Sequence, residues 1–219
     1  VDDPAAVAAE RLIAVAEAGG SIVLAGGSTP RRAYELATDA DWSGATLWFG
    51  DERCVPPTDE RSNFAMAERA LLARLATPPG TVHRIAGELG AEAAADSYEN
   101  LLESAPPFDL VLLGIGPDAH TASLFPGKPA VLERDRLAVA VPEAGLEPLV
   151  ERVTLTVTAL ANAREVMFLA AGTDKTGPVR RSFARDRAEQ TPAAIVAEAA
   201  EAAGAEVTVV LDRDAAAGL

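Results

Sequence analysis

The sequence has few of the residues that build disulfides and metal centres. Cys54 is the only cysteine, and His83 and His120 are the only histidines among 219 residues. One cysteine excludes an internal disulfide, which is typical of a protein from the reducing cytoplasm. Two histidines and one cysteine form no recognisable zinc-binding pattern, so we do not expect metal-dependent chemistry.

Positive charge is also scarce. The formal net charge is −14 at pH 7, which argues against nucleic acid or an anionic membrane as a partner, because both bind basic surfaces. No apolar run is long enough to span a bilayer, and the alanine-rich start carries Asp2, Asp3 and Glu10, unlike a signal peptide. We therefore expect a cytoplasmic protein, a monomer or a weak homo-oligomer, whose partner is a small molecule.

Several common catalytic signatures are missing. The GGSTP turn at 26–30 has neither the GxGxxG spacing of dinucleotide-binding folds nor the GK[ST] ending of nucleoside triphosphate loops. Ser28 does not lie in a GxSxG motif, and no histidine is placed in the sequence to activate Cys54. The sequence therefore disfavours a nicotinamide-dependent enzyme, a serine esterase and a cysteine nucleophile.

What the sequence does contain is a series of short apolar runs separated by helix-like segments. Runs at 22–25, 46–49, 110–113 and 165–171 are typical of strands buried on both faces of a parallel sheet. They predict an α/β fold, a three-layer α/β/α architecture with a doubly wound, mostly parallel, Rossmann-like sheet. No repeat or linker divides the chain, so we expect 1–219 to form a single domain.

Further strands are predicted in the second half of the chain. Residues 206–211 predict a last core strand, and residues 137–141 predict one that ends at Pro142. The alternation of apolar residues and threonine over 152–157 indicates a half-exposed strand. His83 has no polar companion in its segment, so we expect a structural role for it.

Four polar turns each follow a buried strand, at 26–29, 51–53, 118–121 and 173–175. Strands that alternate with helices lie parallel, so these four carboxyl ends share one edge of the sheet, where open α/β sheets bind ligands. The first turn leads into a predicted helix with a hydroxyl cap, and backbone N–H groups at such a helix start bind phosphate or carboxylate. We therefore expect the four turns to form one ligand site.

The turns supply the candidate site residues. His120 is the candidate general base, because it is the only side chain in these turns that titrates near neutral pH. We expect Asp51 or Asp118 to orient it or to bind hydroxyl groups of the ligand. Lys128 and Lys175 are the only lysines, and both lie near the turns in sequence. The candidate catalytic residues are His120, Asp51 and Asp118, and the candidate ligand-binding residues are Gly26, Gly27, Ser28, Thr29, Arg53, Thr121 and Lys175.

These motifs together resemble those of the 6-phosphogluconolactonases. The matching segments are GGSTP at 26–30, DERCVP at 51–56 with SN at 62–63, LLGIGPDAHTASLFPG at 112–127, RVTLT at 152–156 and AGTDK at 171–175. The resemblance implies hydrolysis of 6-phospho-D-glucono-1,5-lactone to 6-phosphogluconate in the pentose phosphate pathway, with no metal or organic cofactor. It also implies the fold shared by glucosamine-6-phosphate deaminase and ribose-5-phosphate isomerase. The alternatives are an amino-sugar phosphate deaminase or isomerase, and a non-catalytic sugar-phosphate-binding domain.

One position departs from the family pattern. The family commonly has glycine between the acidic residue and the histidine, whereas this chain has Ala119. An alanine in a left-handed backbone conformation costs on the order of 1 kcal/mol. We therefore predict a negative φ at Ala119.

Overall fold

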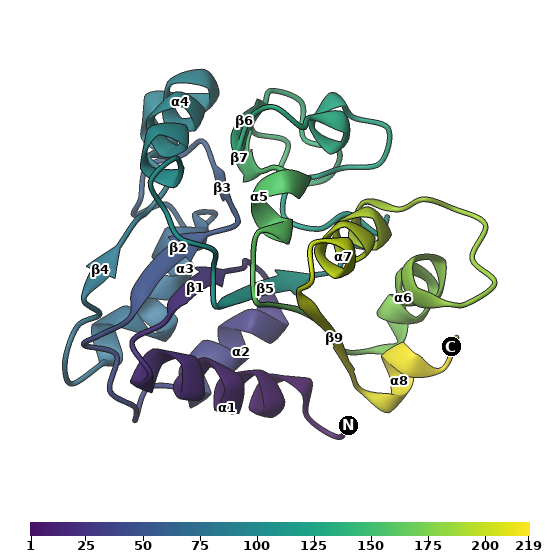
Figure 1. The fold of residues 1–219 in the computed structure, drawn as a ribbon, viewed down its shortest axis with the longest axis horizontal. Helices are drawn as coiled ribbons and strands as arrows, with labels where there is room; N and C mark the ends of the chain where they lie inside the picture. The colour runs from purple at the N-terminus through teal and green to yellow at the C-terminus, as the bar shows by residue number, and fades with distance from the viewer.

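The computed structural model describes residues 1–219, and its centre is a six-stranded parallel sheet (Figure 1). The strand order is β4-β2-β1-β5-β8-β9. All neighbouring strands pair in parallel, as the unbroken apolar runs predict. The strands are β1 (Ser21–Leu24), β2 (Thr46–Phe49), β4 (Thr81–Val82), β5 (Leu110–Gly114), β8 (Glu165–Ala170) and β9 (Glu206–Leu211).

The direction of strand addition reverses between β1 and β5. After β1 the chain adds β2 and β4 on one side, and it then returns to add β5, β8 and β9 on the other. The carboxyl ends of β1 and β5 are therefore neighbours at a topological switch point. Open α/β sheets bind their ligands at such points.

Helices cover both faces of this sheet. Figure 1 shows α1 and α2 on one face and α5 and α7 on the other. The predicted three-layer, doubly wound architecture is therefore confirmed. The helices are α1 (Pro4–Glu17), α2 (Ser28–Leu36), α3 (Asn63–Ala70), α4 (Ala91–Leu102), α5 (Val157–Ala161), α6 (Thr176–Phe183), α7 (Pro192–Ala202) and α8 (Arg213–Ala216), with short 3-10 helices η1 (Leu72–Arg74), η2 (Gly87–Leu89), η3 (Pro129–Leu132) and η4 (Thr173–Lys175).

Local sequence signals account for the helix ends. Asp3 is the N-cap of α1 and accepts hydrogen bonds from the N–H groups of Ala5 and Ala6 at 3.1 and 3.4 Å. Pro4 occupies the first helical position, where no intrahelical donor is lost. Gly19, with φ of 71°, follows the last turn in a left-handed conformation.

A second, smaller sheet was not predicted. It has the order β3-β7-β6 and is antiparallel, with β3 (Asp51–Arg53), β7 (Arg152–Leu155) and β6 (Ala138–Val141). The prediction that 152–157 is half-exposed was wrong, because all four residues of β7 are buried. As the central strand, β7 pairs on both edges, and α4 and α5 pack against it.

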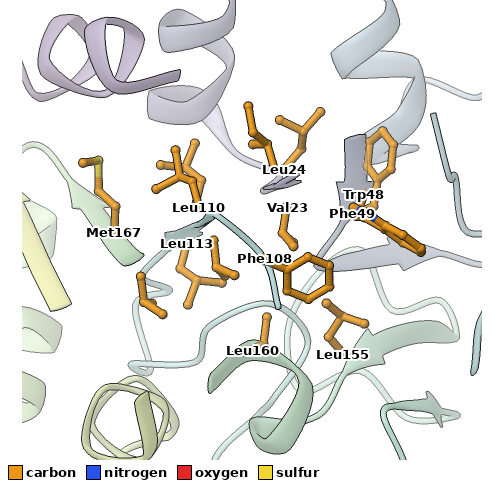
Figure 2. Packing of buried hydrophobic residues seen from close by; sticks show 14 of the residues in the cluster. Val23, Leu24, Trp48, Phe49, Phe108, Leu110, Leu113, Leu155, Leu160 and Met167 are labelled. Atoms are coloured by element: carbon orange, nitrogen blue, oxygen red, sulfur yellow. The ribbon is translucent and has the colours of Figure 1, made fainter. Parts of the chain in front are cut away.

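The hydrophobic core joins the two sheets. Figure 2 shows Leu155 of β7 and Leu160 of α5 near Phe108, which leads into β5. Trp48 and Phe49 of β2 belong to the same cluster of buried side chains. Because the small sheet packs through this core, β3 and β7 are held in a fixed position beside the carboxyl edge of the large sheet.

No helix of the chain is long and apolar enough to cross a membrane.

Candidate active site

A cleft of about 240 Å³ opens at the carboxyl ends of β1 and β5. Each of the four polar turns contributes to its lining, as does the small sheet through Arg152. The lining residues that the sequence analysis named are Gly26, Gly27, Ser28, Thr29, Asp51, Arg53, His120 and Lys175. The cleft therefore lies at the switch point and brings together residues from distant parts of the sequence.

The turn after β1 exposes the start of α2 to the cleft. Gly27 is the N-cap of α2, with φ of 106°, a conformation that favours glycine. The predicted hydroxyl cap was wrong, because no side chain caps this helix. The uncapped N–H groups of the first turn carry the positive end of the helix dipole. They therefore suit an anionic ligand group.

Gly26 is needed for a different reason, which is the close approach of Asn63 at the start of α3. A Cβ atom at position 26 would lie 2.3 Å from Asn63 Oδ1. The Nδ2 group of Asn63 donates to the backbone and carboxylate oxygens of Asp51, both at 2.9 Å. Asn63 therefore fixes the β1 turn against Asp51, a role that the sequence pattern alone does not reveal.

The imidazole of His120 is held on three sides. Asp118 Oδ1 lies 2.5 Å from His120 Nδ1 and also accepts from the His120 N–H at 3.1 Å. The ring packs on the Cα of Gly116, where a Cβ would lie 2.0 Å from Nδ1. The ring of Phe125 lies with its centroid 4.7 Å from that of His120. These contacts hold the imidazole with Nδ1 against Asp118.

Asp118 is the carboxylate that contacts His120. The sequence alone could not decide whether Asp51 or Asp118 has this role. Partial burial raises the pKa of Asp118, but the hydrogen bonds and charge interaction with His120 outweigh it, and the net pKa lies below the usual range. Asp118 is therefore a carboxylate at neutral pH and holds a proton on Nδ1 of His120. The lone pair of the neutral ring is then on Nε2.

The prediction of a negative φ at Ala119 was wrong. Its φ is 67°, and Ala122 also has a positive φ of 47°. The turn is tight, because Gly116 N donates to His120 O at 2.8 Å and Ala119 N donates to Gly116 O at 2.9 Å. This closure requires the left-handed conformation at position 119 whatever residue occupies it, and Ala193 N at the start of α7 donates to the Ala119 carbonyl at 3.3 Å.

Asp51 has partners other than His120. Its Oδ2 accepts from the hydroxyl of Ser123 at 2.6 Å, and its Oδ1 accepts from Asn63 Nδ2. It is nearly buried, with 6% of its surface exposed, yet it lines the cleft. Asp51 is therefore a fixed side chain whose oxygens can accept a hydrogen bond from a ligand hydroxyl. Its contact with Ser123 is a second one that the sequence pattern does not reveal.

The neighbouring Glu52 points away from the cleft and binds the start of α3. Its carboxylate accepts from the N–H groups of Arg53, Asn63 and Phe64 at 2.7, 2.7 and 2.8 Å, and from the Ser62 hydroxyl at 2.9 Å. Burial raises the pKa of Glu52, and these four donors oppose that rise. Glu52 thus connects β3 to α3 and fixes the strand that carries Asp51 and Arg53.

Three cations line the cleft: Arg53, Arg152 and Lys175. Arg53 Nη1 donates to the carbonyl of Arg61 at 2.5 Å, and Arg152 Nη2 donates to the carbonyls of Leu146 and Pro148 at 3.0 and 3.2 Å. Burial lowers the pKa of Arg152, Asp51 opposes this, and Arg53 adds to it. An acidic protein therefore presents a local positive field at this site.

Other singled-out residues lie outside the lining. Thr121 is fully buried and its hydroxyl donates to the Gly114 carbonyl at 2.9 Å, so it shapes the turn instead of facing a ligand. Lys128 lies outside the cleft, where its Nζ is 3.0 Å from the carboxylate of Glu143, whereas Lys175 lines the cleft. His83 stacks on Trp48 with centroids 4.0 Å apart, which is a structural role. Burial and the charges of Glu151 and Glu52 raise the pKa of Cys54 to about 11, which makes it a poor nucleophile.

Comparison with known proteins identifies the class to which this fold and site belong. Residues 3–206 match the family described as glucosamine-6-phosphate isomerases/6-phosphogluconolactonase, and the chain belongs to this family. A Mycobacterium tuberculosis protein named 6-phosphogluconolactonase is 39% identical, over 98% of this chain and 93% of the relative. The Homo sapiens protein of that name is 37% identical, over 81% of this chain and 71% of the relative.

Solved structures agree with the sequence comparison. A 6-phosphogluconolactonase from Trypanosoma cruzi superposes with a TM-score of 0.86 at 31% identity, covering 100% of this chain and 95% of that one. A monomeric glucosamine-6-phosphate deaminase superposes with a TM-score of 0.84 at 20% identity, covering 99% and 95%, and so shares the fold. The resemblance to the 6-phosphogluconolactonases is therefore confirmed, as is the fold type.

Proposed function

We propose that this protein hydrolyses 6-phospho-D-glucono-1,5-lactone to 6-phospho-D-gluconate, the lactone-opening step of the oxidative pentose phosphate pathway. The observation that supports this most directly is the meeting of His120, held by Asp118, with Arg53 and Lys175 in one cleft. The chain's family membership supports the same reaction. A base beside a cluster of cations suits a substrate that carries an ester-like carbonyl and a phosphate.

Binding of the phosphate orients the substrate. Arg53 and Lys175 supply positive charge, and the N–H groups of Gly26, Gly27, Ser28 and Thr29 at the start of α2 supply backbone donors. Asp51 accepts a hydrogen bond from a ring hydroxyl, since its carboxylate lines the cleft and is already held by Ser123 and Asn63. These contacts far from the reacting carbon place C1 beside His120, so that binding energy is used for orientation.

His120 then acts on water. Its neutral ring accepts a proton from the attacking water at Nε2, while Asp118 accepts the hydrogen bond from Nδ1 and stabilises the imidazolium that forms. The hydroxide adds to C1, the ring C–O bond breaks, and the imidazolium donates its proton to the leaving ring oxygen. These reaction steps need no metal and no organic cofactor, because the proton that His120 takes from water is given to the leaving ring oxygen.

The direct test is an assay with the lactone generated in situ. We expect its loss to exceed the spontaneous rate in proportion to enzyme concentration, with 6-phosphogluconate as the product. A parallel incubation with glucosamine 6-phosphate, assayed for ammonia, separates the deaminase alternative. Ammonia release without lactone hydrolysis would assign the cleft to amino-sugar chemistry. The absence of both reactions would indicate a non-catalytic binding domain.

Replacing His120 tests the mechanism. We expect His120→Ala to lower kcat by roughly 10²- to 10⁴-fold with KM within about threefold, because general-base catalysis contributes that much and the cations are untouched. His83→Asn is the matched control, since His83 stacks on Trp48 outside the cleft and its loss leaves kcat unchanged. Near-normal turnover in His120→Ala would remove the proposed base.

A further inference from the structure

Arg53 and Arg152 are direct neighbours across the two strands of the small sheet. They are register partners in the antiparallel pair β3 and β7. The backbone bond from Cys54 N to Glu151 O lies next to them, so Arg53 and Arg152 form a pair without ladder hydrogen bonds between them. Side chains in such pairs approach most closely, and like charges there repel. The fold therefore places two guanidinium groups together at a cost.

Both guanidinium groups also lack a hydrogen-bond acceptor at the same atom. The Nε atoms of Arg53 and Arg152 are buried, and no atom of the chain accepts a hydrogen bond from either. A buried donor without an acceptor is unfavourable, and it is more so on a charged group. Both residues line the cleft, and only 3% of the surface of Arg152 is exposed.

The surroundings of Arg152 hold its guanidinium in place. Its Nη2 donates to the carbonyls of Leu146 and Pro148, and its Cζ lies 5.2 Å from the centroid of the Phe125 ring. Asp51 is the nearby carboxylate, but Ser123 and Asn63 already donate to it. Glu147 also lines the cleft, so the lining carries the three cations Arg53, Arg152 and Lys175 against the two acidic residues Asp51 and Glu147 and keeps a net positive charge.

We propose that Arg152 binds the phosphate of the substrate together with Arg53, and that this pair, more than Arg53 and Lys175 alone, determines the preference for a phosphorylated lactone. The proposal rests on the proposed function for the identity of the substrate. A phosphate relieves the repulsion between the two arginines and accepts hydrogen bonds from the guanidinium N–H groups that the carbonyls of Arg61, Leu146 and Pro148 leave free. Arg152 thereby becomes a specificity-determining residue that also anchors the 146–148 segment of the cleft wall.

The test measures phosphate binding separately from catalysis. Calorimetric titration with inorganic phosphate and with 6-phosphogluconate gives Kd for the wild type, Arg152→Met and Arg152→Lys. We expect Kd to rise about 20-fold in Arg152→Met and about fivefold in Arg152→Lys, which keeps the charge but loses the fork. Arg164→Met is the matched control, because Arg164 is 80% exposed and precedes β8 at the opposite edge of the sheet.

Kinetics supply the second readout. Arg152→Met should lower kcat/KM for the phosphorylated lactone about 20-fold while leaving hydrolysis of unphosphorylated glucono-1,5-lactone within about twofold. Should Arg152→Met not fold, Arg152→Lys carries the same comparison. A phosphate Kd within twofold of wild type in the folded variants, or an equal loss of both substrates, overturns the proposal and leaves Arg152 only its contacts with Leu146 and Pro148. Phosphate binding that depends on Arg152 without lactone hydrolysis would uphold the anion site and reject the proposed function.

Discussion

At the scale of single residues, His120 depends on neighbours that fix its ring. Asp118 contacts Nδ1, Gly116 leaves space for the ring, and Phe125 packs beside it. The position of His120 after a glycine-rich turn made it the candidate base in the sequence, and that role stays a prediction. Its partner could not be predicted, because Asp51 and Asp118 both follow buried strands and only the folded chain separates their contacts.

Asp118 gives the folded state a pH-dependent contribution. Its folded-state pKa lies below the usual value, so the carboxylate stabilises the folded protein above about pH 4, and that stabilisation is lost as the pH falls through the lowered pKa. We expect Asp118→Asn to be less stable than wild type at pH 7, with a difference that shrinks below about pH 4. Urea unfolding between pH 3.5 and 7 measures this, and a difference that stays constant with pH would contradict it.

Ala119 gives a second residue-scale prediction. Ala119→Gly removes the left-handed strain of about 1 kcal/mol, but it also adds unfolded-state freedom and deletes a fully buried methyl group. We expect these effects to offset, with a change in unfolding free energy within about 0.5 kcal/mol. The matched control Ala94→Gly, inside α4 and also fully buried, should lose at least about 1 kcal/mol. Equal losses in the two variants would mean that Ala119 is unstrained.

At the scale of elements, sequence reasoning succeeded where a strand is a continuous apolar run. β1, β2, β5 and β8 are such runs, and their order along the chain predicts the parallel sheet. It failed for β3, because Asp51–Arg53 is three charged residues long and its pattern is that of a solvated turn. These three residues form a strand because of their tertiary contacts, since Glu52 pairs with Val153 of β7 and its carboxylate accepts a hydrogen bond from the start of α3. The place of Arg152 in the cleft was not predicted either, because it also depends on the pairing of β7 with β3.

The link between β3 and α3 is testable. We expect Glu52→Ala to lower the unfolding free energy by roughly 3 kcal/mol, because buried N–H groups of Arg53, Asn63 and Phe64 lose their acceptor. Glu52→Gln should lose about half as much, since one amide oxygen remains. Denaturant unfolding measures both, with the exposed Glu60→Ala as control. A loss below about 1 kcal/mol in Glu52→Ala would mean that water replaces the carboxylate.

At the scale of the whole molecule, the switch point determines where the cleft lies. The strand order places the carboxyl ends of β1 and β5 side by side. The small sheet forms another part of the cleft wall beside the same edge. The location of the site was therefore predictable from the alternation of strands and helices. The identity of its third cation was not, because Arg152 reaches the cleft from a sheet that the sequence pattern did not reveal.

Cys54, as the only cysteine, reports on global unfolding. Burial raises the pKa of its thiol to about 11, so at pH 8 few molecules carry the reactive thiolate. We expect iodoacetamide to alkylate the native protein roughly 100-fold more slowly than the urea-unfolded chain, whose thiol has an ordinary pKa. Mass spectrometry at timed intervals measures both rates. A native rate within tenfold of the unfolded rate would show that the thiol is accessible and unperturbed.

The cleft is assembled from segments that begin with Ala25 and end with Lys175. A ribosome synthesising this chain makes the turn after β1 early and adds Lys175 only after most of the polypeptide has emerged. No nascent fragment that ends before Lys175 contains the whole cleft lining, so the complete cleft forms late in translation.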